Sequence, residues 1–311
     1  MQNSLKSAKI YLPFSYLEKV KRVNEKYTLR VILWDDLPIL LFAFVWGASY
    51  SLLQAVSILF LLISFWCVYE IGYCENDLIA EKYEEQPKLS PTYHKYKGMM
   101  TTFYPWFWSF LSGSIGIIIL EKTQGVQYLF NESWIETKIA SISPVLLMAF
   151  YWTAFLLSMR VCFWVYNNLN KYTRTWLYIF LQSFRYYGFL TVTSINPIGA
   201  SLLSSNIICR SILYVVYRYS GGGSNDWPTQ LPEKILRCLI FIFILGTISL
   251  SGHSLQLWNN WQTWAIIAWC VIQGKGQFIK MFFRVKPIFE DGSNYIKPTF
   301  SSGNNYHQPK I

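Results

Sequence analysis

The chain is divided into eight apolar segments, each close to the length that crosses a lipid bilayer. A helix needs ~20 apolar residues to cross ~30 Å of hydrocarbon. Charged residues make up only 14% of the 311 residues, whereas a soluble domain carries about 25%. The sequence therefore predicts an all-α, polytopic membrane helix bundle of eight or nine transmembrane helices. The predicted spans are residues 37–53, 55–74, 103–120, 139–159, 175–193, 197–217, 235–252 and 258–273.

Lysine and arginine gather in alternate connections between these spans, and this pattern predicts an orientation. The N-terminus, the loops after the second, fourth and sixth spans, and the C-terminus are all basic. By the positive-inside rule, both termini are cytoplasmic. We expect a cytoplasmic basic N-terminal segment (1–36), a transmembrane helical domain (37–284) and a cytoplasmic polar tail (285–311).

The net charge of +10 does not indicate a nucleic-acid partner, because the basic residues form no domain of their own. They are better explained as topology signals and as contacts with anionic lipid. The sequence is also compatible with an oligomer.

An acidic stretch, residues 69–90, leaves the second span and holds six of the 17 acidic residues. If the helix of that span continues, each residue turns by ~100°. Carboxylates on one helix face repel each other unless a cation lies between them. Mg²⁺, with carboxylate and phosphate oxygens as ligands, would relieve that repulsion. A solvated acidic helix end is the alternative. The stripe predicted on one face consists of Glu70, Tyr73, Asp77, Glu81 and Glu84.

Two cytoplasmic loops are predicted to lie near the acidic stretch. The loop after the fourth span carries Lys171, and the loop after the sixth begins with Tyr217 and Arg218. Cationic side chains there would neutralise a phosphate or diphosphate group. We therefore expect the acidic stretch and both loops to converge on the cytoplasmic side.

Three ionisable residues, Glu70, Arg185 and Arg210, fall within apolar spans. An ionised side chain near the bilayer centre costs roughly 3 kcal/mol or more, so it faces a polar cavity or a partner. Arg185 lies nearest to the middle of its span and is predicted to line a cavity. Arg210 either does the same or reaches the surface at its helix end. Glu70 either extends the acidic face inward or pairs with an arginine.

The acidic stretch resembles the first motif of the UbiA superfamily of intramembrane prenyltransferases, N-D-x-x-D-x-x-x-D, which follows the second membrane helix. Asn76 and Asp77 match the start of this motif. Ala80 replaces its second aspartate, with Glu81 one place later, and Glu84 stands at the last position. The family's second motif, D-x-x-x-D after the sixth helix, is replaced here by YRYSGGGSND. This departure weakens the case for an allylic diphosphate held by two Mg²⁺ ions between two acidic motifs.

One branch of the superfamily, the decaprenyl-phosphate phosphoribosyltransferases, is more similar. Its second motif is K-R-Y-like, and Tyr217-Arg218-Tyr219 resembles it. Its fifth helix carries Arg-x-x-x-Gly, and Arg185 and Gly188 stand one residue closer together than in that pattern. The resemblance implies an integral protein of a bacterial inner membrane.

The resemblance implies a Mg²⁺-dependent transferase that acts on a polyprenyl phosphate or diphosphate. Two reactions remain open, namely prenyl transfer to a small-molecule acceptor and phosphoribosyl transfer from phosphoribosyl diphosphate to a polyprenyl phosphate. The alternative is a transporter or flippase for an anionic solute or lipid, because the same charged residues would serve a translocation path. The implied metal ligands are Asn76, Asp77, Glu81 and Glu84, the implied substrate-binding residues are Lys171, Arg185, Tyr217 and Arg218, and the implied catalytic residues are Asp77 and Arg218.

Overall fold

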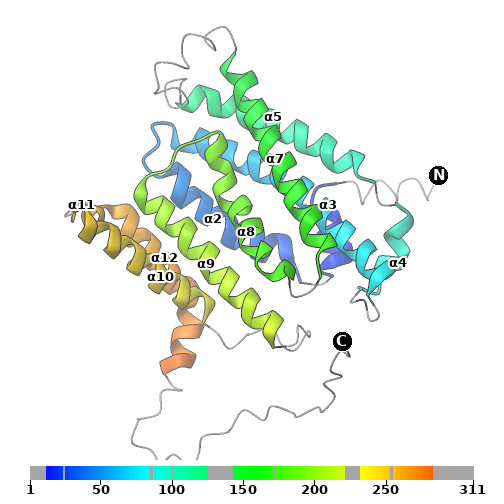
Figure 1. Ribbon diagram of the computed structural model, residues 1–311. Coiled ribbons are helices and arrows are strands. Elements are labelled where there is room, and N and C mark those ends of the chain that lie inside the picture. The colour runs from blue at the N-terminus through cyan, green and yellow to red at the C-terminus, as the bar shows by residue number, and fades with distance from the viewer. Residues whose placement is uncertain are drawn as a thin grey trace, which may run out of the picture.

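The described part of the structure, a computed structural model, consists mainly of helices (Figure 1). It describes residues 12–23, 25–84, 87, 89–99, 101–124, 143–170, 173–220, 232–252 and 255–282. Within these ranges no strand occurs, which confirms the all-α class. The helical elements are η1 (Leu17–Lys21), η2 (Thr28–Asp36), α2 (Leu37–Leu40), η3 (Leu41–Val45), α3 (Ser51–Tyr83), α4 (Tyr93–Tyr96), η4 (Lys97–Met99), α5 (Phe103–Gln124), α7 (Pro144–Asn168), η6 (Thr173–Thr175), α8 (Leu177–Tyr187), η7 (Gly188–Thr191), α9 (Pro197–Tyr219), α10 (Glu233–Ser251), α11 (Gln256–Asn259) and α12 (Trp261–Phe282).

Five of these helices, namely α3, α5, α7, α9 and α10, are long and apolar enough to cross a membrane. Each of the eight predicted spans overlaps a described helix, but the predicted count of eight or nine membrane-spanning helices is not confirmed. The other three predicted spans correspond to the consecutive helices η2, α2 and η3, to the 11-residue α8 with η7, and to α12. Long apolar helices nevertheless support an integral membrane protein.

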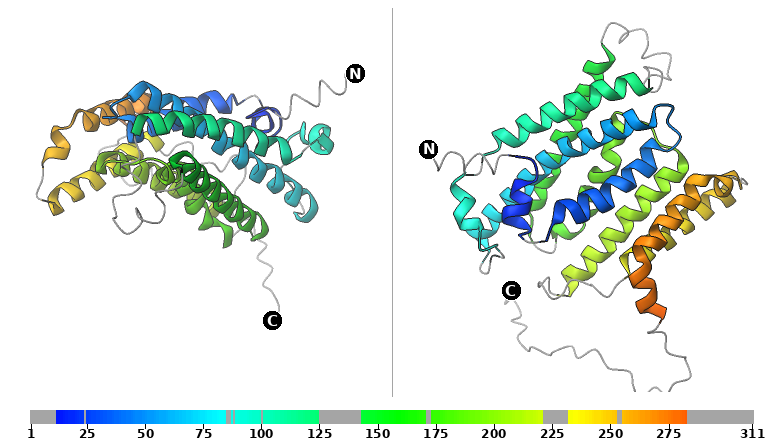
Figure 2. Two further views of the ribbon diagram at one scale, coloured as in Figure 1. Left: turned by 90° about the horizontal axis from the view of Figure 1, so that it is seen from above. Right: turned by 180° about the vertical axis from the view of Figure 1, so that it is seen from behind.

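The helices lie in two layers, which Figure 2 shows from above. One layer contains η2–α2–η3, α3, α5 and α12, and the other contains α7, α8, α9 and α10. The ends of α3, α7 and α9 lie toward the same end of the bundle (Figure 1), which also holds the start of α10. We call this the charged end, because the side chains described below gather there.

The first helical run begins earlier than predicted. η2, α2 and η3 follow one another without a break over residues 28–45, and the chain turns at 46–50 before α3 begins. The predicted span 37–53 is therefore wrong at both ends, and the predicted boundary after residue 36 falls inside a helix. The physical reason is that Asp35 and Asp36, which a hydropathy pattern assigns to a loop, are buried against cations from other helices.

Asp36 is completely buried and joins η2 to α8. Arg185 donates its Nε–H to Asp36 Oδ2 at 2.9 Å, and its Nη2 contacts the same oxygen. The Tyr186 hydroxyl donates to Oδ1 at 2.7 Å. The Arg185 guanidinium also lies 4.7 Å from the centre of the Trp66 ring on α3. These contacts fix three helices around a single carboxylate.

Asp35 joins the same run to α9 and α10. Its Oδ1 accepts hydrogen bonds from Arg237 Nη1 at 2.7 Å and Lys234 Nζ at 2.8 Å, and its Oδ2 accepts one from Arg210 Nη2 at 2.5 Å. Arg237 has no exposed surface, and its guanidinium lies 4.3 Å from the centre of the Trp269 ring on α12. A second carboxylate therefore draws three further helices together.

The helices α3 and α7 approach each other closely at Gly72. A Cβ atom added there would collide with the Phe163 ring. Asn167 Nδ2 also donates to the Gly72 carbonyl oxygen at 2.9 Å. The missing side chain at Gly72 therefore permits both the ring contact and the hydrogen bond.

Replacing Asp36 by leucine should strongly destabilise the protein, because Arg185 would remain buried without its counter-charge. Breaking a buried ion pair from one side costs about 3–5 kcal/mol, whereas replacing both partners by apolar residues is close to neutral. Thermal denaturation in one detergent should show a large loss for Asp36→Leu and substantial recovery in the double variant Asp36→Leu, Arg185→Met. Equal unfolding midpoints for the single and double variants would contradict this pairing.

Replacing Gly72 by alanine should lower the unfolding temperature, because the new methyl group overlaps the Phe163 ring. Overpacking of this kind costs about 1–3 kcal/mol. Gly276→Ala on α12 is the matched control, since a Cβ there meets no atom within 4 Å. The control should be neutral or slightly stabilising, because alanine favours helix over glycine by about 1 kcal/mol. The same loss in both variants would point to a general effect of the substitution.

Candidate functional site at the charged end

The acidic stretch continues the second membrane helix, as predicted. The helix α3 runs without interruption to Tyr83, and Glu84 then has an extended backbone, three residues before Pro87. Asp77 is buried, Asn76 is half-buried and Glu84 is exposed. The stretch therefore passes from the bundle interior to its surface within a few turns.

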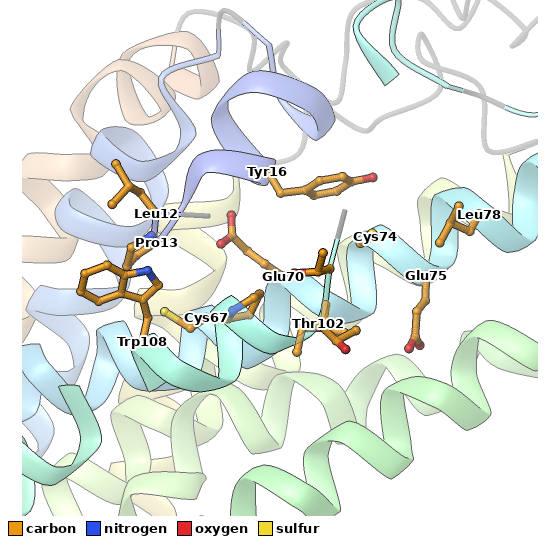
Figure 3. Close-up of a pocket in the computed structure, with 13 residues that line it drawn as sticks. Leu12, Pro13, Tyr16, Cys67, Glu70, Cys74, Glu75, Leu78, Thr102 and Trp108 are labelled. Carbon is orange, nitrogen blue, oxygen red and sulfur yellow. The ribbon is translucent and has the colours of Figure 1, made fainter. Parts of the chain in front are cut away.

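Residues 12–23, which we call the 12–23 segment, pack across the charged end of α3 (Figure 3). The Glu70 carboxyl group accepts the backbone N–H groups of Phe14 and Leu17, each at 2.9 Å. These donors belong to the start of a short helix, where N–H groups lack helical partners. Glu70 thus caps the helix of the 12–23 segment, and pairing with an arginine is not what the structure shows.

Asp77 makes a second attachment for the 12–23 segment. The Tyr16 hydroxyl donates to Asp77 Oδ2 at 2.6 Å, and Lys21 Nζ forms an ion pair with Oδ1. Burial, followed by the neighbouring Asp77 carboxylate, raises the pKa of the Tyr16 hydroxyl. Tyr16 therefore stays protonated and remains a hydrogen-bond donor to Asp77.

The other predicted metal ligands have different partners. Glu81 Oε2 contacts Lys97 Nζ at 2.5 Å and accepts a hydrogen bond from the Tyr93 hydroxyl at 2.9 Å. Glu84 Oε1 lies 3.6 Å from Arg174 Nη2. Within the predicted stripe, Asp77, Glu81 and Glu84 each face a cation of their own, and Glu70 binds backbone N–H groups. These partners reduce the repulsion from which the shared metal ion was predicted.

These contacts do not support the predicted magnesium site at Asn76, Asp77, Glu81 and Glu84. Among the residues that the structure describes, no three histidine, cysteine, aspartate or glutamate side chains lie close enough to hold a metal ion. A Lys21 ammonium group also occupies Asp77. In this arrangement the side chains do not fit a metal ion, and the magnesium requirement stays a prediction.

The ends of α7 and α9 contact each other, and η6 connects them to Glu84, the residue that follows α3. The Tyr166 and Tyr214 hydroxyl groups are hydrogen-bonded to each other, and Arg218 Nε donates to the Tyr214 oxygen at 2.7 Å. The Arg174 guanidinium lies 5.4 Å from the centre of the Tyr166 ring and contacts Glu84. A continuous chain of polar contacts therefore joins α3, η6, α7 and α9.

The remaining predicted binding residues are distributed between two places. Tyr217 is half-buried at the charged end, with its ring centre 5.5 Å from the Arg218 guanidinium. Arg185 is instead buried in the ion pair with Asp36, and Arg210, which is half-buried, binds Asp35. Lys171, the GGGS run and the tail from residue 285 onward lie outside the described residues.

Sequence reasoning missed the partners of these charges. Asp35 and Asp36 directly precede an apolar run, and arginines within apolar spans need partners of opposite charge. The pairing of these aspartates with the arginines was therefore predictable from the sequence. No sequence pattern indicated the contacts of Lys21 and Tyr16 with Asp77, because these residues lie roughly 60 positions from Asp77. The contact of Arg174 with Glu84 was likewise not predictable, because Arg174 is one of several basic residues in its loop.

Together, the fold and the charged end define an all-helical protein with five candidate membrane-spanning helices and a polar site where three of them end. Comparison with known protein families, curated proteins and solved structures finds no match. The resemblance to the UbiA superfamily therefore stays a prediction from the motif residues of the sequence.

Replacing Asp77 by asparagine should loosen the 12–23 segment, because Lys21 would lose its counter-charge. A hydrogen bond to a charged group is worth about 1.5–3 kcal/mol, which corresponds to roughly tenfold or more in the population of the released segment. Limited trypsin digestion should therefore cleave after Lys21 and Arg22 roughly tenfold faster.

Glu84→Gln is the control for this experiment, since it makes an equivalent change just after the end of α3 and its ion-pair partner is Arg174. Digestion of this variant at Lys21 and Arg22 should proceed at the wild-type rate. Unchanged cleavage in Asp77→Asn would show that Asp77 does not hold the segment.

Proposed function

We propose that this protein is an integral-membrane transferase of the UbiA type that acts on a polyprenyl phosphate or diphosphate. The observation that carries the proposal is the convergence of charged and tyrosine side chains from α3, α7 and α9 at one end of a bundle of apolar helices. The motif residues Asn76, Asp77 and Arg218 all lie at this end. An amphiphilic substrate with a long apolar chain and a phosphate head matches such a surface.

The charged end offers cations to a phosphate group. Arg218 and Lys21 are both partly exposed, and Arg174 lies between α7 and α3. Arginine provides five N–H donors in a planar fork that matches phosphate oxygens. Neutralising the charge on phosphate groups is a main contribution of proteins to phosphoryl and diphosphate chemistry. The apolar chain of the lipid would lie along the exposed apolar faces of the membrane-spanning helices.

The same proposal includes eight or nine membrane-spanning helices, cytoplasmic termini and a location in a bacterial inner membrane. Either prenyl transfer or phosphoribosyl transfer would place the reacting phosphate at the charged end. The proposal does not depend on magnesium, and the metal requirement is tested separately.

A transporter for an anionic solute or lipid is the second candidate, and a different observation favours it. The cationic side chains of Arg185, Arg210, Lys234 and Arg237 face Asp35 and Asp36, and Lys234 also contacts Glu233 at 3.7 Å, so cations outnumber carboxylates in this described cluster. An excess of positive charge within membrane helices is typical of an ion or substrate pathway. Transport would require these ion pairs to open, whereas the transferase uses the charged end as it stands.

The decisive experiment is mass spectrometry of products formed by the purified protein. One reaction contains a polyprenyl phosphate with phosphoribosyl diphosphate, and another contains a prenyl diphosphate with a pool of aromatic acceptors. Each is run with Mg²⁺ and with EDTA. We expect a phosphoribosylated lipid or a prenylated acceptor, and no such product after Asp77→Asn.

Arg218→Ala should lower the rate about tenfold to a hundredfold, the effect of losing one charge-assisted hydrogen bond. The control is Lys82→Ala, which removes an exposed cation near the end of α3. This control should retain the wild-type rate. Absence of product in every reaction would overturn the transferase proposal, and phosphate-stimulated exchange of labelled anion in liposomes would then support the transporter.

A further inference from the structure

A pocket of about 110 Å³ lies beneath the 12–23 segment (Figure 3). Its walls come from the 12–23 segment, from α3 and from the start of α5. Most of the lining is apolar and includes Pro13, Ile71, Leu78 and Trp108. A largely apolar wall with a few polar groups is typical of a small-molecule site.

Glu70 supplies the first polar group of this pocket. It is buried, and no cationic side chain among the described residues forms an ion pair with it. Its two oxygens each accept one backbone N–H, from Phe14 and Leu17. A carboxylate offers about four acceptor positions, so Glu70 retains capacity for a further donor.

Glu75, five residues further along α3, also lines the pocket. In Figure 3 its side chain extends away from Tyr16. Glu75 Oε1 is bound by Arg160, whereas the buried Oε2 has no hydrogen-bond partner among the described atoms. Arg160 Nη1 is buried without a partner too, so the same guanidinium offers this oxygen a donor, and Glu70 carries the argument for a ligand.

The size and polarity of the pocket restrict its ligand. A dry apolar cavity of about 150 Å³ accommodates benzene, so this pocket takes a group of roughly one small ring or one isoprene unit. Glu70 and Glu75 both present acceptor oxygens, which an anionic ligand group would not satisfy. The complementary ligand has an apolar body and an O–H or N–H donor.

The pocket lies beside the charged end. Tyr16 lines the pocket and its hydroxyl donates to Asp77, so a single side chain separates the two sites. Cys74 and Leu78 line the pocket on the helical turns that flank Asp77. A molecule in this pocket would therefore lie next to the residues proposed to bind the lipid phosphate.

We infer that this pocket binds the acceptor co-substrate, an apolar alcohol or amine whose donor group is held by Glu70. Its role as an acceptor site rests on the transferase function proposed above, but the binding itself does not. The 12–23 segment forms the roof of the site, and its attachment through Glu70 and Asp77 couples pocket closure to the charged end.

The test is equilibrium binding to the full-length protein in nanodiscs, with empty nanodiscs as the background for partition into lipid. The probes are benzyl alcohol, benzylamine and benzoate, which share one ring and differ in the polar group. No lipid phosphate is present. We expect benzyl alcohol and benzylamine to bind at least about tenfold more tightly than benzoate.

Two variants locate the site. Leu78→Trp should weaken binding of the alcohol and the amine about tenfold by filling the pocket, and it is tolerated because Leu78 is already partly exposed. Glu70→Gln should weaken binding of benzylamine more than that of benzyl alcohol, because the carboxylate charge is lost. Glu84→Gln, outside the pocket, should bind all three probes as the wild type does. Trypsin digestion of each variant confirms that the 12–23 segment is still attached.

Equal binding of the three probes, or binding that Leu78→Trp leaves unchanged, would overturn the pocket assignment. Such a result would leave the transferase proposal standing if lipid products form. Selective binding with no product in any transfer reaction would instead support the pocket and overturn its role as an acceptor site. The two proposals therefore fail through different measurements.

Discussion

The pairing of Asp35 and Asp36 with four cationic side chains is the interaction on which the bundle depends. Between apolar helices surrounded by lipid, the hydrophobic effect distinguishes poorly between protein and lipid contacts. Ion pairs and hydrogen bonds in the interior therefore specify which helices meet and at what height. Two adjacent residues on one helical run bind α8, α9 and α10, and aromatic rings from α3 and α12 cover the arginines.

Ion pairs and hydrogen bonds also select which segments meet at the charged end, where they surround the proposed binding site. The α3 carboxylates are satisfied by cations and by backbone N–H groups from segments that lie far away in the sequence. Glu70 and Asp77 hold the 12–23 segment, Glu81 holds α4 and η4, and Glu84 contacts Arg174. A ligand can displace the partly exposed cations that face Glu81 and Glu84 at modest cost, since exposed ion pairs contribute little stability. The buried Asp77 holds Lys21 more firmly.

Much of the architecture was predictable because the apolar segments have bilayer length and helical structure satisfies their backbone groups internally. The extension of α3 through the acidic stretch and the meeting of α3, α7 and α9 were predicted from span order and charge. The start of the first helix was not, because a pair of aspartates resembles a polar boundary until its partners are known. The shared metal stripe was likewise inferred from one helix alone, without the cations that neighbouring segments bring to Glu81 and Glu84.

The sequence by itself determined the helical class, the apolar segments and the position of the charged residues along each helix, since these depend on local composition and on a fixed helical period. Only the tertiary structure decided which opposite charges meet. Arg185 was predicted to serve a cavity and instead binds Asp36, about 150 residues away. Asp77, predicted to bind a metal ion, binds Lys21. The reason is that an ion pair depends on distance in space, and a single sequence specifies that distance only through the packing of the whole chain.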